Sequence, residues 1–344
     1  MKFQNFQTRH LFNSIFWIVL VFTNCTSSSG QLKNQKKITG VNIVAPVKKT
    51  PRKAFSSPKE IGVNSVSLIP YAFVNIKKNK VIFKHPHQWW GETPQGISQC
   101  IEDAYSYGLT VMIKPHLWIG YNKFTGDLSF NSKKQWTTFE SSYRDYILEF
   151  AQIASAYNVE YFCIGTELKT FIKKRPLFWK NLIQEIKSLY KGKLTYAANW
   201  DEFEQIDIWK ELDYIGIDAY FPLSSKKQPS LDQLKKSWSK YVKKIALVSK
   251  NYNKEVVFTE YGYRNSQFNT AKPWEEKNTV QNNRNQTLAY QALLETFYPL
   301  KWFHGGYCWK WFISEKYKQI TIGFTPQNNK ETLNTIKLHY LKNQ

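Results

Sequence analysis

The sequence predicts an α/β fold, a single (β/α)8 TIM barrel, from three observations. Short β-branched or apolar runs alternate with segments of helical periodicity, and this alternation indicates a parallel sheet. Eight such runs fit into the 344-residue chain, which suits a closed barrel better than an open sheet. The first run is not followed by the Gly-rich phosphate-binding loop that opens many doubly wound sheets. An open sheet is therefore the weaker alternative.

The elements follow one another in a regular order. Strands are predicted at 38–46, 63–73, 110–119, 159–168, 194–200, 214–220, 255–263 and 303–312. Helices are predicted where apolar residues recur at helical spacing, at 96–107, 139–157, 176–190, 231–250, 287–298 and 328–341. The first connection, 50–61, contains Pro51 and Pro58 and therefore allows only a short or broken helix. The fifth connection, 202–212, is similarly short.

The N-terminus has the pattern of an export signal. Lys2 and Arg9 precede an apolar stretch at 11–22, which is shorter than the roughly 20 residues of a membrane-spanning helix. Cys25 then heads a run of small and polar residues, an arrangement that resembles a bacterial lipoprotein signal. In such signals cleavage leaves the cysteine as the lipidated N-terminus. A plain signal peptide that discards Cys25 is the alternative.

This pattern divides the chain into three parts. We expect 1–25 to be a signal peptide of the lipoprotein type, 26–37 a flexible tether, and 38–344 the catalytic barrel. The protein is then exported and held at the cell envelope, and it meets the membrane only through its lipid anchor. A monomer is expected.

Composition narrows the classes of partner. Aromatic residues make up 17% of the chain, and their flat faces suit stacking on sugar rings or bases. The net charge of +22 is compatible with nucleic-acid binding, yet the lysines are scattered and no zinc knuckle or RNP-like motif accompanies them. We therefore expect a solvated basic surface and no nucleic-acid partner. Cys100, Cys163 and Cys308 match no metal motif or disulfide framework, so we expect buried thiols and no metal.

Polar and aromatic residues gather at the ends of the predicted strands. Barrel enzymes place their chemistry at this carboxyl-terminal mouth, because the βα loops open there. The residues concerned are Tyr71, His116, Trp118, Glu167, Asn199, Trp200, Asp218, Tyr220, Glu260, Trp309 and Trp311. They are the candidates for a binding or catalytic site.

Two glutamates stand out among these residues. Glu167 ends the fourth predicted strand and Glu260 the seventh. Hydrolysis of a glycosidic bond with retention needs an acid and a nucleophilic carboxylate about 5–5.5 Å apart. Side chains alternate along a strand, so Glu167 shares a face with Cys163, and Glu260 shares one with Val256 and Phe258. If both faces point into the barrel, the two carboxylates meet at its mouth.

The strand-end motifs resemble a known family. An acid/base Glu on strand four and a nucleophile Glu on strand seven are typical of glycoside hydrolase clan A. Within that clan, IGTEL, IGIDAYFPL, FTEYGYR and GGYCWKWF resemble glycoside hydrolase family 113, over about residues 38–341. The resemblance implies a retaining endo-β-1,4-mannanase that works through a covalent glycosyl-enzyme intermediate without cofactor or metal. It implies that Glu167 is the acid/base and Glu260 the nucleophile, with Glu167 of raised pKa and Glu260 ionised.

One position departs from the clan pattern. Many clan members carry Asn before the acid/base, where it binds the sugar 2-hydroxyl, whereas this chain has Thr166. Thr166 or a residue of another strand, such as Asn199, must then make that contact. This difference bears on substrate details more than on mechanism.

The remaining candidates have a binding role and a structural alternative each. Tyr220 is placed to hydrogen-bond the nucleophile, or else packs at the rim. Trp309 or Trp311 can form the floor under the sugar, or else belongs to the core. Asp218 either binds sugar hydroxyls or pairs with a Lys or Arg. At the third strand end, His116 and Trp118 are further candidates for a sugar subsite, and the alternative for His116 is a structural histidine with satisfied hydrogen bonds.

Three other functions remain open at this point. An exo-acting β-mannosidase or a β-glucanase would use the same pair of glutamates. A barrel that binds glycans without cutting them is the third. In each case the expected partner is a β-linked polysaccharide or oligosaccharide.

Overall fold

The computed structural model describes residues 36–121, 123–277 and 280–343. Residues 36–344 form one compact unit. The predicted signal peptide, the lipidation site Cys25 and nearly all of the tether lie outside the described residues. Within the described ranges, every helix is too short or too polar to cross a membrane.

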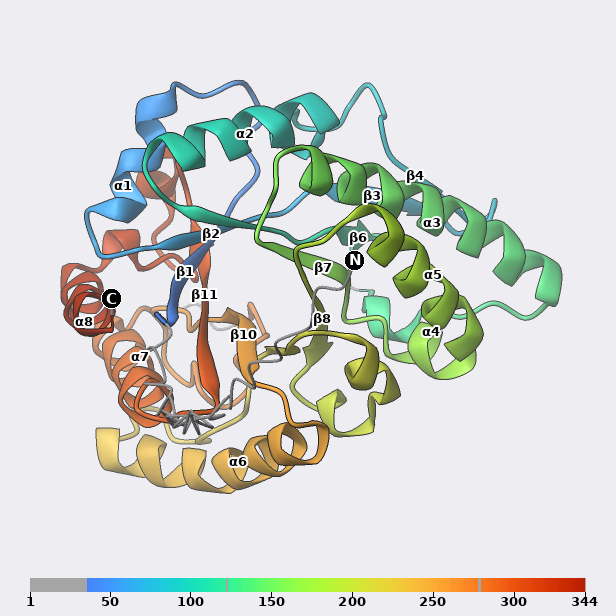
Figure 1. Cartoon of the computed structure of the whole chain (residues 1–344). Helices are drawn as coiled ribbons and strands as arrows, with labels where there is room; N and C mark the ends of the chain where they lie inside the picture. The colour runs from blue at the N-terminus through green and yellow to red at the C-terminus, as the bar shows by residue number, and fades with distance from the viewer. Residues whose placement is uncertain (1–35, 122, 278–279, 344) are drawn as a thin grey trace, which may run out of the picture. The chain divides into compact units, whose positions relative to one another are not determined.

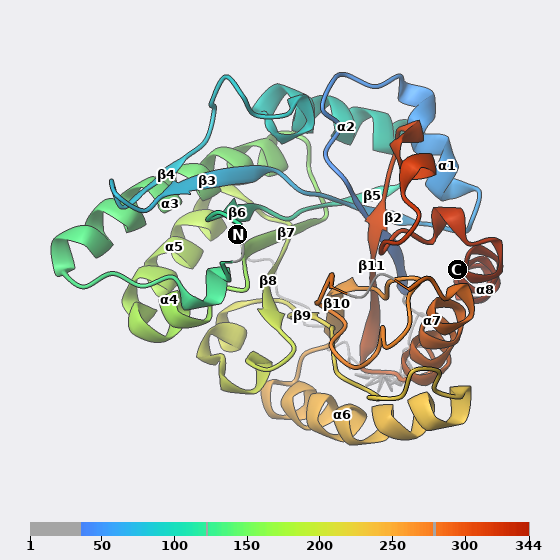
Figure 2. The ribbon, with the colours of Figure 1, turned by 180° about the vertical axis from the view of Figure 1, so that it is seen from behind.

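Eight parallel strands close into a barrel (Figures 1 and 2). In order around the barrel they are β1 (Ile38–Ile43), β2 (Ser65–Leu68), β5 (Thr110–Ile113), β7 (Tyr161–Thr166), β8 (Lys193–Asn199), β9 (Ile215–Asp218), β10 (Val256–Tyr261) and β11 (Phe303–Trp311). Parallel pairing of β1 with β11 completes the ring. The predicted single (β/α)8 TIM barrel is confirmed.

Helices surround the barrel on its outside (Figure 1). They are α1 (Ser56–Lys59), α2 (Pro94–Ser106), α3 (Lys133–Ala156), α4 (Lys169–Lys174), α5 (Pro176–Leu189), α6 (Leu231–Tyr252), α7 (Asn283–Phe297) and α8 (Lys330–Lys342). The two connections predicted to be short are short: 50–61 holds α1 and one 3₁₀ turn, and 202–212 holds two 3₁₀ turns. The short helix α4 was not predicted.

Local sequence explains where the long helices begin and end. Ser132 and Ser230 precede α3 and α6, and each side chain accepts a hydrogen bond from a backbone N–H of the first turn. A glutamine three residues later completes the capping box in both helices. Helix α6 ends at Tyr252, and the next residue, Asn253, has a φ of 51° in the left-handed region that asparagine tolerates.

The core has two layers. The larger layer lies between strands and helices and buries most of the bulky aromatic side chains, including Trp179, Trp209 and Trp238. A smaller cluster fills the barrel interior, and its members are Ile38, Met112, Cys163, Ala197, Tyr214, Val257 and Tyr307. Cys100, Cys163 and Cys308 are buried and free. Most of the aromatic content therefore serves packing rather than binding.

Two predicted strands are each divided by a proline. The run at 63–73 breaks at Pro70 and that at 110–119 at Pro115, because proline donates no ladder hydrogen bond. Beyond these breaks, β3 (Tyr71–Asn75), β4 (Lys80–Ile82) and β6 (His116–Trp118) form a separate sheet in the order β4-β3-β6. Its strand β3 pairs with β6 so that Tyr71 lies opposite His116. The prediction of continuous strands was wrong here.

The predicted face of β10 was also wrong. Val256 and Phe258 pack in the outer core, while Val257 belongs to the barrel interior. The pairing with β9 shifts register between Phe258 and Glu260, and such a bulge re-aims the side chains that follow it. Glu260 consequently lines the cavity at the barrel mouth, while Phe258 points outward into the core between strands and helices.

Candidate active site

A cavity of about 250 Å³ lies at the carboxyl ends of the barrel strands. It brings Glu167 and Glu260 together with several other strand-end residues. The lining consists of Tyr71, His116, Leu117, Thr125, Thr166, Glu167, Asp218, Tyr220, Glu260, Trp274, Glu276, Trp309 and Phe324. Both glutamates therefore open onto the same space, as the strand positions predicted.

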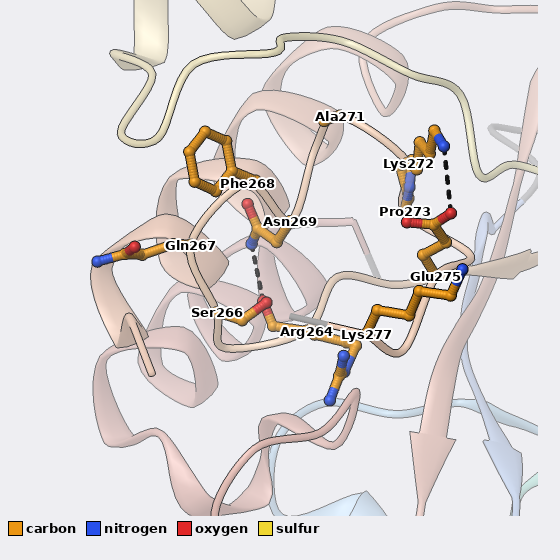
Figure 3. Close-up of a pocket in the computed structure, with 10 residues that line it drawn as sticks. All are labelled: Arg264, Ser266, Gln267, Phe268, Asn269, Ala271, Lys272, Pro273, Glu275 and Lys277. Atoms are coloured by element: carbon orange, nitrogen blue, oxygen red, sulfur yellow. Dashed lines mark hydrogen bonds and ion pairs between the residues drawn. The ribbon is translucent and has the colours of Figure 1, made fainter. Parts of the chain in front are cut away.

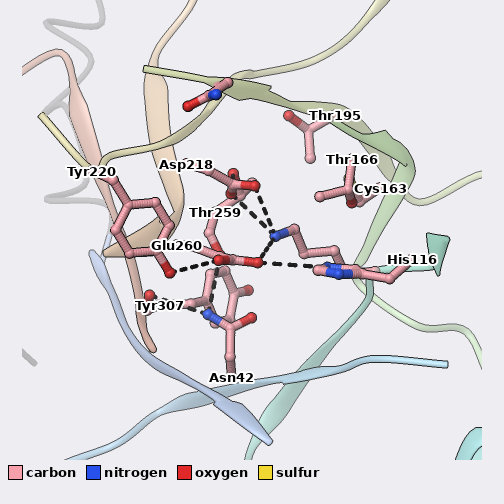
Figure 4. A network of polar contacts seen from close by, with 12 residues as sticks. Asn42, His116, Cys163, Thr166, Thr195, Asp218, Tyr220, Thr259, Glu260 and Tyr307 are labelled. Atoms are coloured by element: carbon pink, nitrogen blue, oxygen red, sulfur yellow. Dashed lines mark hydrogen bonds and ion pairs between the residues drawn. The ribbon is translucent and has the colours of Figure 1, made fainter. Parts of the chain in front are cut away.

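Glu260 is held by donors on both carboxylate oxygens (Figure 4). The Tyr220 hydroxyl donates to Oε2 at 2.7 Å, and the Lys114 ammonium donates to Oε1. Nε2 of His116 lies 3.5 Å from the same Oε1. Glu260 is only 5% exposed, so these groups replace water around its charge. Both carboxylate oxygens therefore act as hydrogen-bond acceptors.

Lys114 connects Glu260 to Asp218. Its side chain is fully buried, and Nζ lies 3.1 and 3.2 Å from the two carboxylate oxygens of Asp218. Thr259 donates a further hydrogen bond to Asp218 at 2.7 Å. Burial opposes the charge of Lys114, but the two carboxylates outweigh it and raise the lysine pKa above its ordinary value. One permanent cation therefore serves two carboxyl groups.

The same contacts also affect the pKa of Asp218. Burial and the charge of Glu260 raise its pKa to about 7, against the opposing effect of Lys114 and Thr259. The aspartate therefore pairs with a lysine, which is one of the two roles the sequence left open for it.

Glu167 has a different environment from Glu260. Burial raises its pKa well above the ordinary value, and the negative charges of Asp218 and Glu260 raise it further. This is the direction that a general acid requires. Its backbone φ of +52° lies in the left-handed region, and its N–H donates to the Ala197 carbonyl at 2.8 Å. Non-glycine residues held in that conformation cluster at functional sites.

Aromatic rings form two walls of the cavity. The His116 ring lies parallel to Trp309, with 6.2 Å between ring centroids, and meets the Tyr71 ring edge-on at 5.0 Å. Burial and the charge of Lys114 lower the pKa of His116 well below its ordinary value, so the imidazole is neutral. On another wall, Trp274 stacks on Trp200 at 5.4 Å. These faces suit contact with sugar rings.

Comparison of the sequence with protein families decides the assignment. The profile of Glycoside Hydrolase Family 113 matches residues 48–323. The chain belongs to this family. It is therefore a glycoside hydrolase, which agrees with the paired glutamates at the barrel mouth. No curated protein sequence matches the chain.

Solved structures of this hydrolase family have the same fold. The family 113 β-mannanase of Alicyclobacillus acidocaldarius, solved in complex with ManMIm, superposes with a TM-score of 0.78 at 20% sequence identity. The match covers 90% of this chain and 98% of the mannanase chain. A second family 113 β-1,4-mannanase gives 0.77 at 22% identity, covering 89% and 99%. A structure described as a β-D-glucuronidase, from Dictyoglomus thermophilum, gives a TM-score of 0.60 at 13% identity. That match covers 89% of this chain and 51% of the glucuronidase chain.

Three predicted site residues of this family 113 hydrolase do not line the cavity: Trp118, which lines an adjoining hollow, Trp311 and Asn199. Trp311 is 3% exposed, and its indole N–H donates to the Ser57 hydroxyl at 3.1 Å beside a separate hollow. Asn199 is not among the lining residues, and its side-chain oxygen accepts the Trp200 backbone N–H at 2.7 Å. Trp309 lines the cavity in place of Trp311, and Thr166 lines it in place of Asn199.

Sequence reasoning missed the buried cation Lys114 and five residues that line the cavity, which are Leu117, Thr125, Trp274, Glu276 and Phe324. Lys114 could have been found in the sequence, because it is the one lysine, arginine or acidic residue in the predicted third strand, 110–119. Trp274 and Glu276 line the cavity from the long loop after β10, where the sequence has no periodicity that would place them.

Another hollow of about 390 Å³ lies along the loop after β10 (Figure 3). Lys272 and Glu275 form an ion pair of 3.2 Å on its wall, and Asn269 donates to the Arg264 carbonyl at 2.8 Å. Glu275 is the single carboxylate among its described lining residues. A two-carboxylate reaction therefore belongs to the first cavity.

Proposed function

We propose that this family 113 hydrolase is a retaining endo-β-1,4-mannanase, with Glu260 as nucleophile and Glu167 as acid/base. The supporting observation is the contrast between two glutamates that line one cavity. Donors from Tyr220 and Lys114 hold Glu260 as an anion, whereas burial and neighbouring negative charge favour the protonated form of Glu167. These are the two states that the first step of a retaining mechanism needs.

In the first step a Glu260 oxygen bonds to the anomeric carbon while the glycosidic C–O bond breaks. The electron pair of that bond takes the proton of Glu167, and the leaving sugar departs with a new hydroxyl group. In the second step Glu167, now a carboxylate, takes a proton from water. The water oxygen bonds to the anomeric carbon and releases Glu260, so two inversions give net retention.

In this cycle Asp218 serves as the lasting counter-ion of Lys114. When Glu260 becomes an ester it loses its negative charge. Without Asp218, the ammonium group of Lys114 would then be a buried cation with no counter-ion. Asp218 remains 3.1 Å from the ammonium group and keeps it paired throughout. The Tyr220 hydroxyl stays within reach of the ester, where it supports the leaving carboxylate of the second step.

The sugar assignment has separate support. The solved family 113 structures that resemble this chain are described as β-mannanases. An exo-acting β-mannosidase or a β-glucanase with the same glutamates is the alternative. A non-catalytic glycan-binding barrel is disfavoured by the paired environments of Glu167 and Glu260.

The test is a panel of β-mannan, glucomannan, cellulose and xylan, with product analysis and the anomeric form of the first product determined by proton NMR. We expect β-anomeric manno-oligosaccharides of mixed length, and Glu167→Ala and Glu260→Ala to abolish their formation. Release of mannose alone would favour the exo-acting enzyme, and cello-oligosaccharides the glucanase. An α-anomeric first product, or full activity in Glu260→Ala, would contradict the retaining mechanism.

We also propose that the enzyme is exported and anchored through Cys25. Fractionation of cells producing the wild-type protein and Cys25→Ser provides the test. The wild type is expected with the membranes and the variant in the soluble fraction, and the same distribution for both would exclude the anchor.

A further inference from the structure

The two peptide groups on either side of the Glu167 Cα atom are both bound to strand β8. The N–H of Glu167 itself donates to the carbonyl of Ala197 at 2.8 Å. The N–H of the next residue, Leu168, donates to the side-chain hydroxyl of Tyr196 at 2.6 Å. Because peptide groups are planar, their orientations set φ and ψ of the residue between them. Strand β8 therefore fixes the backbone from which the Glu167 carboxyl group projects.

This stretch of backbone needs such support. The φ of Glu167 is +52°, in a region that a residue with a side chain adopts at an energetic cost. Conformations of this kind persist only where the surrounding structure holds them in place. Helix α4, which follows directly, has no side-chain cap at its N-cap residue Leu168. The bonds from β8 are therefore the support that the structure shows for this turn.

Tyr196 is itself held in one orientation. Its ring is fully buried and packs edge-on against Trp179, with 5.9 Å between ring centroids, and against Trp209 at 6.0 Å. Its hydroxyl donates to Oε1 of Glu202 at 3.2 Å. A hydroxyl has a single proton, so this bond turns the oxygen lone pairs toward the N–H of Leu168.

Glu202 completes this chain of contacts. It is 1% exposed, and its Oε1 also accepts the Asn199 backbone N–H at 2.9 Å, which fixes the carboxyl group on the turn after β8. Neither Glu202 nor Tyr196 is among the residues that line the catalytic cavity. Any effect of these two side chains on the reaction must therefore pass through Glu167.

We propose that Tyr196, oriented by Glu202, is a positioning residue for the acid/base: its hydroxyl holds the peptide after Glu167 and thereby directs the carboxyl group at the glycosidic oxygen. This inference rests on the proposed function, because it takes Glu167 as the acid. Without the hydroxyl, the buried N–H of Leu168 loses its acceptor and the turn relaxes. The proton donor is then displaced from its line of transfer, which slows the reaction.

The proposed role determines which substrates depend on Tyr196. A leaving group that is stable as an anion departs without a proton, whereas a poor leaving group requires one from the acid. Loss of positioning should therefore slow the cleavage of poor leaving groups selectively. A residue that only stabilises the fold would affect both kinds of substrate alike.

The experiment compares two aryl glycosides of the sugar that the substrate panel identifies, one with a dinitrophenyl and one with a phenyl leaving group. The measured quantity is the ratio of kcat/KM for the dinitrophenyl glycoside to that for the phenyl glycoside. We expect Tyr196→Phe to raise this ratio about tenfold or more, through loss of activity on the phenyl glycoside. On the dinitrophenyl glycoside kcat and KM should fall together, because the second step needs Glu167 as the base.

Glu202 provides a second pair of variants. Glu202→Leu removes the acceptor of the Tyr196 hydroxyl and should raise the ratio, whereas Glu202→Gln retains an oxygen that accepts and should keep the ratio near that of the wild type. If Tyr196→Phe does not fold by circular dichroism, this pair decides the question through the same ratio.

Tyr190→Phe is the matched control. Tyr190 is 2% exposed, and its hydroxyl donates to the Val159 carbonyl at 2.9 Å. Both residues precede the starts of β7 and β8, at the opposite end of the barrel from Glu167. The control loses a comparable buried hydrogen bond and should leave the ratio unchanged.

Equal losses on the two glycosides in Tyr196→Phe, or a ratio equal to that of the wild type, would overturn the proposal. Failure of the proposed function has a different signature, because Glu167→Ala itself would then leave the ratio unchanged. A ratio that rises in Glu167→Ala but not in Tyr196→Phe would keep Glu167 as the acid and exclude the positioning role.

Discussion

Nζ of Lys114 lies 3.1 Å from Oδ1 of Asp218, in a site where neither side chain is more than 1% exposed. The same ammonium contacts Glu260, which stands opposite Asp218 in the pairing of β10 with β9. Two adjacent buried carboxylates would repel each other strongly without this cation. The lysine therefore supplies the cation that both carboxyl groups contact at the barrel mouth.

The first prediction concerns the loss of this cation in Lys114→Met. Asp218 and Glu260 then face each other without the ammonium group that both contact, so kcat/KM at pH 7 should fall by about 100-fold or more. The free energy of unfolding at pH 7 should fall by about 3–5 kcal/mol, as for other broken buried ion pairs. Steady-state kinetics and urea unfolding measure the two effects.

Lys235→Met is the matched control, because Lys235 pairs with Glu295 on the surface. Such pairs contribute about 0–1 kcal/mol, so both kcat/KM and the unfolding curve should stay near those of the wild type. A kcat/KM in Lys114→Met equal to the wild-type value would show that the lysine has a structural role alone.

The second prediction concerns the hydroxyl that Tyr220 donates to Glu260 at 2.7 Å. Tyr220→Phe removes a hydrogen bond to a charged group, which is commonly worth about 1.5–3 kcal/mol. We expect kcat/KM to fall about 10- to 100-fold while the folded structure is retained. Steady-state kinetics and circular dichroism provide the measurements.

Tyr263→Phe provides the comparison for this change. The Tyr263 hydroxyl is buried and has no hydrogen-bond partner among the described residues, so its removal should leave kcat/KM within about twofold and stability unchanged or higher. If both variants lost activity equally, the effect of Tyr220 would have to be one of packing.

The fold was predictable because its signals are local and repeated. Each strand is a short apolar run bounded by turns, and helix starts such as Ser230 carry a side-chain cap. The breaks at Pro70 and Pro115 were visible in the sequence as well. The sequence does not show that the chain resumes as a second sheet beyond each break, because that depends on pairing between distant residues.

The site was predictable where strand ends alone determine it, as for Glu167, Glu260 and Tyr220. It was not predictable where register matters. The bulge before Glu260 reverses the alternation of β10, and Trp309 and Trp311 could not be distinguished without the register of β11. The partner of Asp218 also required the barrel, because Lys114 lies 104 positions away in the sequence.

The third prediction concerns the basic limb of the pH profile. In the proposed mechanism Glu167 must be protonated to act as the acid, so activity should fall as pH rises through its pKa. Burial raises that pKa and the charge of Asp218 raises it further. Asp218→Asn removes the second effect and should move the basic limb of kcat/KM to lower pH. In Asp201→Asn, where the aspartate pairs with Lys169 at the surface, the limb should not move. A limb that shifts upward in Asp218→Asn would contradict the assignment of Glu167 as the acid.

The fourth prediction concerns stability and Glu202. This residue is 1% exposed, its Oε1 accepts the Asn199 backbone N–H at 2.9 Å, and its Oε2 has no partner among the described residues. Burial raises its pKa from 4.5 to about 7. A carboxyl group whose pKa is higher in the native than in the unfolded protein stabilises the native state at pH values below its unfolded-state pKa. This contribution is lost as pH rises through the native-state pKa. The loss between pH 4.5 and pH 8 is on the order of 3 kcal/mol.

Glu202→Gln does not titrate, so the decline in unfolding free energy between pH 4.5 and pH 8 should be smaller in this variant than in the wild type. Urea unfolding at the two pH values gives the comparison. Glu204→Gln is the control, because Glu204 lies on the surface in an ion pair with Lys244 and should leave the decline unaltered. Other buried carboxyls, Glu92 among them, contribute equally to all three proteins and cancel from the difference. An equal decline in Glu202→Gln and the wild type would mean that Glu202 is ionised in the native barrel at pH 4.5 as it is at pH 8.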